Sequence, residues 1–129
     1  MTVRWLTEEW LTAAAAEGSG ATGPPTLTAS VVVEVTGGAE GDAVAHAVFD
    51  GGCLVGSGAG TLPSPDVTLT LTDADAQAVL SGALDLSVAF MQGRMKVAGA
   101  MAPLVDLLAL AGTDDARARR GRLARLTDF

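Results

Sequence analysis

Residues 66–110 read DVTLTLTDADAQAVLSGALDLSVAFMQGRMKVAGAMAPLVDLLAL, and the hydrophobic period changes repeatedly along them. Threonine alternates with valine and leucine over 67–72, which predicts a strand with one apolar face. From Asp73 the apolar residues recur at helical spacing, and Gly82 is a typical C-terminal stop. The segment is therefore expected to open with a strand that passes directly into a short helix.

The rest of this segment predicts a short helix over 86–91, a strand over 94–98 and a last helix that runs to about 111. Pro103 fits the first turn of that last helix. Between 102 and 111 only Asp106 is charged or strongly polar, so the helix is expected to need cover on both sides. Deep burial, a bound lipid or a dimer partner would each supply it, and the periodicity alone favours deep burial.

The residues before this segment predict one helix and three strands. Thr7 is a suitable N-cap for a helix to about 17, and the glycine- and proline-rich residues 18–25 then break the pattern. From Leu27 the period switches to two. Strands are expected over 27–36, 43–49 and 53–59, joined by turn residues at 37–42 and by Asp50-Gly51.

Clustered strands with short connections favour the α+β class, because a parallel α/β sheet would need alternating helices. The predicted fold is a five-stranded, mostly antiparallel sheet with helices packed on one face. A chain of 129 residues has the length of one domain. We assign the domain to residues 1–112 and an Arg-rich C-terminal tail to residues 113–129.

Composition and charge exclude several classes of function. Apolar residues make up 49% of the chain, which is incompatible with disorder. Residues 1–112 hold three basic and twelve acidic residues, so no nucleic-acid partner is expected. The longest apolar stretch, 102–112, is too short to span a membrane, and Glu8 and Glu9 interrupt any signal peptide. The expected location is the cytoplasm.

No pattern in the sequence predicts an enzyme, a metal site or a cofactor. The glycine run 56–61 lacks the lysine of a phosphate-binding loop. His46 and Cys53 fall on neighbouring predicted strands and leave a hydrolase hypothesis open, but a structural histidine is favoured. One histidine and one cysteine provide too few ligands for a transition metal.

The 66–110 segment resembles the sterol carrier protein-2 family, here as a stand-alone bacterial member. The resemblance rests on DVTLTL at 66–71, Ser81-Gly82, the Phe-x-Gln-Gly-basic turn at 90–94, a strand ending at Gly99, and the final apolar helix. It implies an apolar tunnel between helices and sheet that binds fatty acids, fatty acyl-CoA, sterols or phospholipids without catalysis. Ala100 departs from the Asp or Asn common there, and the chain lacks a peroxisomal Ser-Lys-Leu ending.

The resemblance also implies a ligand site on the turn and the final helix. Gln92 is the polar group expected at the cavity, where its amide would bond a hydroxyl or carboxyl head. The apolar lining is expected from Phe90, Met91, Met95, Met101, Leu104, Leu107 and Leu108.

Two further points stay open at the level of sequence. The arginines of the tail are best explained as a solvated helix or frayed end, with transient contact to a membrane surface as the alternative. The final helix would also serve an interaction module that dimerises without carrying lipid. The sequence therefore leaves monomer and dimer undecided.

Overall fold

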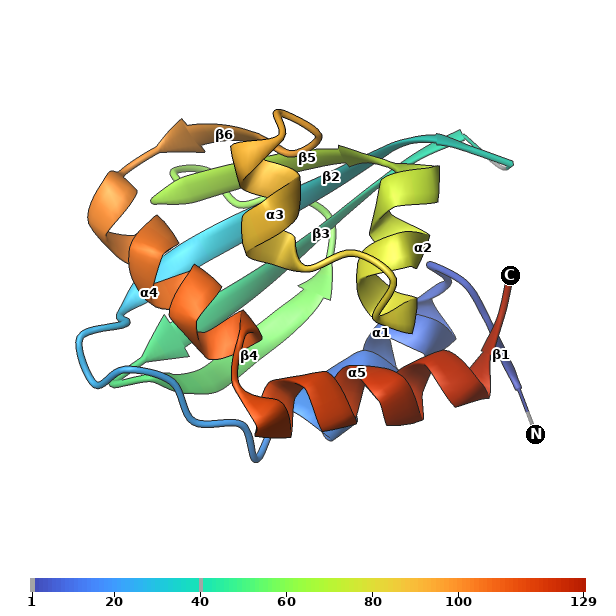
Figure 1. The fold of residues 1–129 in the computed structure, drawn as a ribbon, viewed down its shortest axis with the longest axis horizontal. Helices are drawn as coiled ribbons and strands as arrows, with labels where there is room; N and C mark the ends of the chain where they lie inside the picture. Colours follow the sequence, from blue (N-terminus) through green and yellow to red (C-terminus); the bar gives the residue numbers. More distant parts are fainter. Residues whose placement is uncertain (1, 40) are drawn as a thin grey trace.

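A computed structural model describes residues 2–39 and 41–129 and contains the predicted α+β fold. The main sheet has the strand order β4-β3-β2-β5-β6 (Figure 1). Its strands are β2 (Ala29–Gly38), β3 (Gly41–Asp50), β4 (Cys53–Ala59), β5 (Val67–Thr72) and β6 (Lys96–Gly99). Glu40, in the predicted turn at 37–42, lies outside the described residues.

The strand pairing confirms the predicted meander. β3 pairs antiparallel with β2 on one side and with β4 on the other. β5 crosses over to the far side of β2 and pairs with it in parallel, so that Val31 lies opposite Val67. β6 then pairs antiparallel with β5. The strand predicted from Arg94 begins only at Lys96, because the backbone N–H groups of Arg94 and Met95 bond to the carbonyl of Ala89 instead of to β5.

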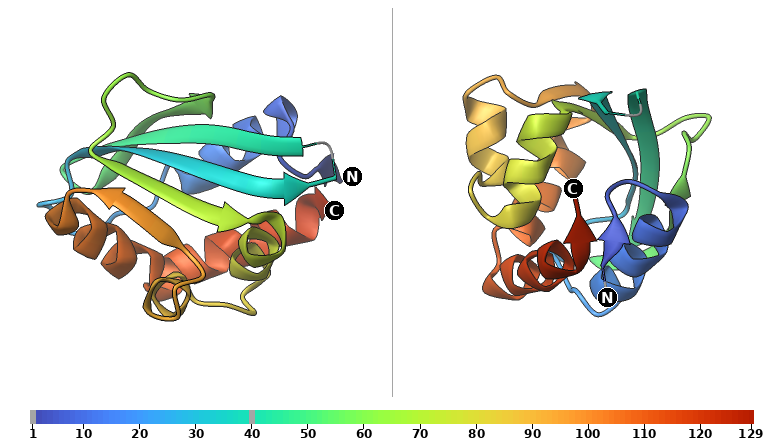
Figure 2. Two further views of the ribbon diagram at one scale, coloured as in Figure 1. Left: turned by 90° about the horizontal axis from the view of Figure 1, so that it is seen from above. Right: turned by 90° about the vertical axis from the view of Figure 1, so that its right-hand side faces the viewer.

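The helices lie on one face of this sheet (Figure 2). They are α1 (Glu8–Gly18), α2 (Asp73–Ser81), α3 (Leu86–Met91), α4 (Met101–Ala111) and α5 (Asp114–Leu126). The hydroxyls of Thr7 and Thr72 accept hydrogen bonds from the backbone N–H groups at the starts of α1 and α2. Gly82 ends α2 with φ 86°, as predicted. Among the helices of the described residues, none has both the length and the apolarity to cross a membrane.

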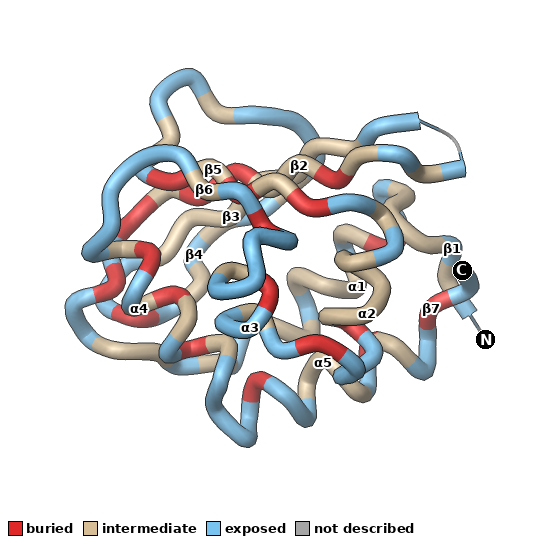
Figure 3. The backbone as a smooth tube through the Cα atoms, turned by 45° about the horizontal axis from the view of Figure 1, so that its top comes forward, coloured by how far each residue is buried: buried red, intermediate tan, exposed pale blue. Residues whose placement is uncertain are grey.

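The core lies between the central strands and the helices, and Figure 3 shows the buried residues along both. Helix α4 contributes Leu104 and Leu107 to the main cluster, while Leu110 packs on Leu27 and Ala29. The cover expected on both sides of α4 is therefore partly present. Val105 on its outer side remains 59% exposed.

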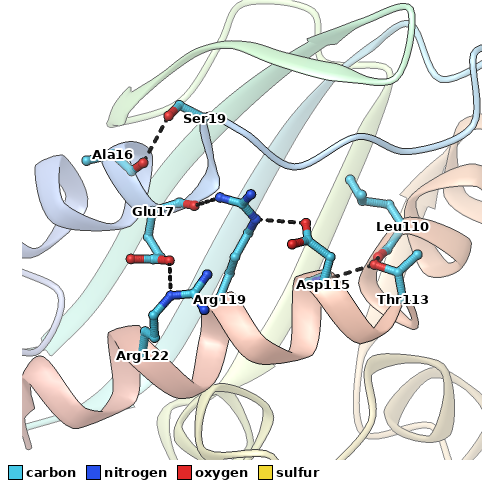
Figure 4. A network of polar contacts seen from close by, with 9 residues as sticks. Ala16, Glu17, Ser19, Leu110, Thr113, Asp115, Arg119 and Arg122 are labelled. Carbon is cyan, nitrogen blue, oxygen red and sulfur yellow. Dashed lines mark hydrogen bonds and ion pairs between the residues drawn. The ribbon is translucent and has the colours of Figure 1, made fainter.

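Residues 113–129 form a structured helix and a short strand. On α5, Ala116 and Leu123 are buried, and the arginines lie on the more exposed sides. The helix packs along α1, where the Arg122 Nε lies 2.6 Å from the Glu17 Oε1 (Figure 4). Two short strands, β1 (Val3–Arg4) and β7 (Thr127–Asp128), pair in parallel next to these helices. The described part of the tail is thus integrated into the fold, with one face solvated.

Candidate functional site

A cavity of about 540 Å³ opens between the sheet and the helices. Its sheet wall is formed by β2, β3, β4 and β5 and includes Val33, Ala45 and Leu69. Its other walls come from the five helices, and its further apolar lining includes Trp5, Trp10, Leu11, Val79, Leu80, Leu86 and Leu107. The volume falls within the ~300–1,000 Å³ typical of small-molecule sites.

Small side chains explain why this space is not filled by protein. The inward face of β3 carries Ala43, Ala45 and Ala47, and α1 faces the cavity with Ala14 and Ala15. A methyl group reaches far less deeply than a leucine or phenylalanine, so two layers at ordinary spacing leave a gap where both present alanine. The alanines of β3 and α1 therefore leave room for the cavity.

Four residues with polar side chains line the cavity: Glu8, His46, Ser57 and Arg120. Strand alternation places the His46 side chain on the opposite sheet face from Ala45 and Ala47, and its Nδ1 lies 3.0 Å from the Gly60 carbonyl oxygen. Glu8 and Ser57 are exposed and also line a smaller pocket between α1 and β4. They mark the rim of the cavity.

Arg120 is the cationic lining residue. It lies on α5, is partly buried, and its Nη2 donates a 2.8 Å hydrogen bond to the carbonyl of Ala111 at the end of α4. Burial lowers the pKa of the Arg120 guanidinium, and the charge of Arg117 lowers it further, while Asp85 acts in the opposite direction. An arginine nevertheless keeps its proton at neutral pH, so the cavity wall carries a positive charge.

The structure places the eight residues of the predicted site in different environments. Leu107 lines the cavity. Met95 and Leu104 are buried in the main core, and Phe90 and Leu108 pack against it. The other three are exposed: Met91, Gln92 and Met101. The Gln92 Oε1 lies 3.5 Å from the Arg94 Nη1 in the turn after α3, and its role at a ligand head stays a prediction.

The remaining cavity residues were not expected from the sequence, although a signal for them was present. A strand with alanine at three successive inward positions leaves unfilled volume in a small core. The run Ala43-Val-Ala-His-Ala47 shows that pattern, and so do the alanines at 13–16. The resemblance pointed to the turn and the last helix instead, and of that set Leu107 alone reaches this cavity.

The His46–Cys53 pair that the hydrolase hypothesis requires does not form. The strand register pairs His46 with Gly58 and Cys53 with Asp50, so the two side chains are four positions apart along the strand. At ~3.3 Å per residue this is about 13 Å, well beyond hydrogen-bond reach. Within residues 2–39 and 41–129, no group of three His, Cys, Asp or Glu side chains is arranged to hold a metal ion.

Similar folds occur among solved structures. A conserved hypothetical protein of Thermus thermophilus, described as a possible sterol carrier protein, aligns with a TM-score of 0.75 at 19% identity, covering 92% of this chain and 89% of that one. A sterol carrier protein 2 aligns at 0.71 and 16% identity, covering 95% and 98%. Palmitated SCP2L2 of Aedes aegypti aligns at 0.63 and 20% identity, covering 88% and 96%.

The fold is therefore that of the sterol carrier proteins, as predicted. A comparison with curated proteins found no match. The comparison with family models matched residues 25–112 to the SCP-2 sterol transfer family, which is more than half of the chain. The match covers the main sheet, α2, α3 and α4, and the chain belongs to the SCP-2 sterol transfer family.

Proposed function

We propose that this protein binds an apolar lipid in the cavity between the sheet and the helices, and carries it without chemical change. The observation that supports this is a cavity of about 540 Å³ with a mostly apolar lining in a member of a sterol transfer family. One protein of the same fold is described as palmitated. The proposal covers four ligand classes: fatty acids, acyl-CoA, sterol-like lipids and phospholipids.

Burial of the ligand chain supplies the affinity. About fifteen methylene groups at ~0.8 kcal/mol each give roughly 12 kcal/mol before costs. The loss of entropy on association and the ordering of the ligand chain cost about 4–15 kcal/mol. Micromolar binding follows, which suits a carrier that must release its cargo. We further propose that this carriage takes place in the cytoplasm and involves transient contact with a membrane surface.

A substitution that fills the cavity tests the proposal. Ala45→Phe places a ring into the cavity from the centre of β3, whereas Ala98→Phe places the same ring on the exposed face of β6. Wild type and Ala98→Phe should release lipid on organic extraction, appear loaded in native mass spectrometry, and bind a fluorescent fatty acid. Ala45→Phe should do none of these while keeping a folded circular dichroism spectrum.

Two results would count against this function. One is a wild-type protein that is always empty and ignores the fluorescent probe. The other is uptake by Ala45→Phe equal to that of Ala98→Phe, because the ligand would then lie elsewhere. An empty protein that sediments as a tight dimer would favour the interaction module instead.

A further inference from the structure

Arg120 differs from its neighbours on α5 in what it contacts. Three of the other arginines form ion pairs: Arg117 with Asp85, Arg119 with Asp115, and Arg122 with Glu17. Arg120 has no ion pair among the described residues, and it donates a hydrogen bond to the carbonyl of Ala111. Arg119 also donates to a backbone carbonyl, that of Glu17, but its charge is paired with Asp115 as well. Arg120, which faces the cavity, has a neutral partner without an ion pair.

Nearby carboxylates do not neutralise this charge. Asp85 attracts it, but Asp85 lies 3.5 Å from the Arg117 Nη2 and is about half exposed. Glu8 is the acidic residue of the cavity lining, and it lies at the rim shared with Ser57 of β4. Arg120 instead contacts the end of α4. Among the described residues, the positive charge therefore sits on an otherwise apolar wall without a carboxylate in ion-pair contact.

The geometry of the guanidinium limits which ligand head groups can pair with Arg120. It presents five N–H donors in a planar fork, of which the bond to Ala111 occupies one. Carboxylates match that fork with two parallel hydrogen bonds, and charge-assisted bonds of this kind are about twice as strong as neutral ones. A neutral head group would leave a partly desolvated charge unbalanced.

We infer that the cavity selects a long-chain carboxylate, with the carboxylate held by the guanidinium of Arg120 and the chain lying along the alanines of β3. The inference rests on the proposed function and narrows it from apolar lipids in general to anionic amphiphiles. It also gives the ligand an orientation, because the head group lies at the α5 wall and the tail lies toward the sheet.

A pair of ligands that differ only in charge tests this selection. Isothermal titration calorimetry at neutral pH would compare laurate with lauryl alcohol, which have the same chain. Wild type should bind laurate at least about tenfold more tightly, the ratio expected for a charge-assisted bond in a partly buried site. In Arg120→Gln the ratio should fall to near one, mainly through weaker laurate binding.

Arg125→Gln is the matched control. It removes the same charge from the last turn of the same helix, at an exposed position outside the cavity, and should keep the wild-type ratio. Thermal unfolding reports whether each variant folds. If Arg120→Gln does not fold, Arg120→Met replaces it, because methionine keeps an aliphatic stem in the half-buried position, and the same ratio is measured.

The different failures are distinguishable. If the wild type binds laurate and the alcohol with equal affinity, the inference is overturned, whereas the proposed lipid binding is unaffected. Parallel loss of both affinities in Arg120→Gln, with the ratio unchanged, shows that Arg120 only supports the fold and also overturns it. Binding of neither ligand to the folded wild type overturns the inference, and if the protein is also empty on organic extraction the proposed function is overturned with it.

Discussion

The indole nitrogen of Trp10 donates a 2.9 Å hydrogen bond to the hydroxyl of Thr127, which lies 117 residues further along the chain. That hydroxyl donates in turn to the carbonyl of Leu123, at 2.6 Å. Trp5 packs edge-on against Trp10, with ring centroids 4.7 Å apart. Since Trp5 and Trp10 both line the cavity, this contact joins one cavity wall to the end of α5.

Loss of the Thr127 hydroxyl should weaken the protein measurably. Thr127→Val keeps the shape of the side chain but leaves the buried indole N–H of Trp10 without its acceptor, at an expected cost of about 1–3 kcal/mol. Urea unfolding followed by tryptophan fluorescence measures this. Thr127→Ser keeps the hydroxyl and should lose less. Equal stability of Thr127→Val and wild type would show that the indole finds another partner.

Two neighbours on α5 should differ strongly in their effect on stability. Leu123 is 7% exposed and packs against Trp10 and Leu80, so Leu123→Ala should cost about 2–5 kcal/mol. Arg122 is about half exposed in its pair with Glu17, so Arg122→Gln should cost under about 1 kcal/mol, and less at high salt. Denaturant unfolding of both variants at low and high salt checks this contrast. A reversed order would mean that ion pairs, not apolar contacts, attach α5.

Acid should remove one contact between α2 and the turn before β6. The hydrogen bonds from Arg94 lower the pKa of Asp75 against an opposing effect of burial, and the charge of Arg94 and the Thr72 hydroxyl lower it further. The folded pKa therefore lies below the unfolded value of about 3.9. The stabilisation is complete above that value and is lost as the pH falls through the folded pKa.

Thermal unfolding across pH provides the measurement for this pair. The difference between wild type and Asp75→Asn should be largest at neutral pH and should shrink below about pH 4, where the unfolded carboxyl takes up its proton. Arg94→Gln should show the same trend, because it removes the other partner. A difference that stays constant down to strong acid would argue against the ion pair.

Gly99 ends β6 in a conformation that favours glycine. Its φ is 114°, and an added Cβ would collide with the backbone carbonyl of Asp66. Gly93 also has a positive φ, of 73°, but an added Cβ there would meet no atom within 4 Å. Gly93→Ala should cost about 1–2 kcal/mol for its backbone conformation alone. Gly99→Ala should cost more, as measured by thermal unfolding, and equal costs would show that the Asp66 backbone yields.

Most of the fold was predictable from hydrophobic period and turn residues. The limits of β4, β5 and α3 match the sequence prediction, because Gly, Pro and Asp residues bound each of them. The parallel pairing of β2 with β5 does not follow from the pattern, since a period of two does not specify strand direction. The attachment of α5 was missed because Leu123 and Ala116 stand among five arginines.

The candidate site was less predictable than the fold. Local patterns identify side chains that are present, whereas a cavity depends on volume that facing layers leave empty. Ala45 and Ala14 are ordinary residues singly, and their joint effect requires knowing that β3 and α1 line one space. The sequence likewise does not distinguish Arg120 from an arginine on a solvated helix, because the packing of α5 against α1 and α4 is what places it in the cavity wall.

The residues that line the cavity come from two parts of the chain. The sheet, α2 and α4 lie within residues 25–112, which match the family, whereas Trp10 and Arg120 lie on α1 and α5 outside them. On the proposed binding mode, substitutions in α1 and α5 are expected to alter the choice of head group without disturbing strand register. Ligand preference would then diverge separately from architecture, and members that share this sheet would not need to share a ligand.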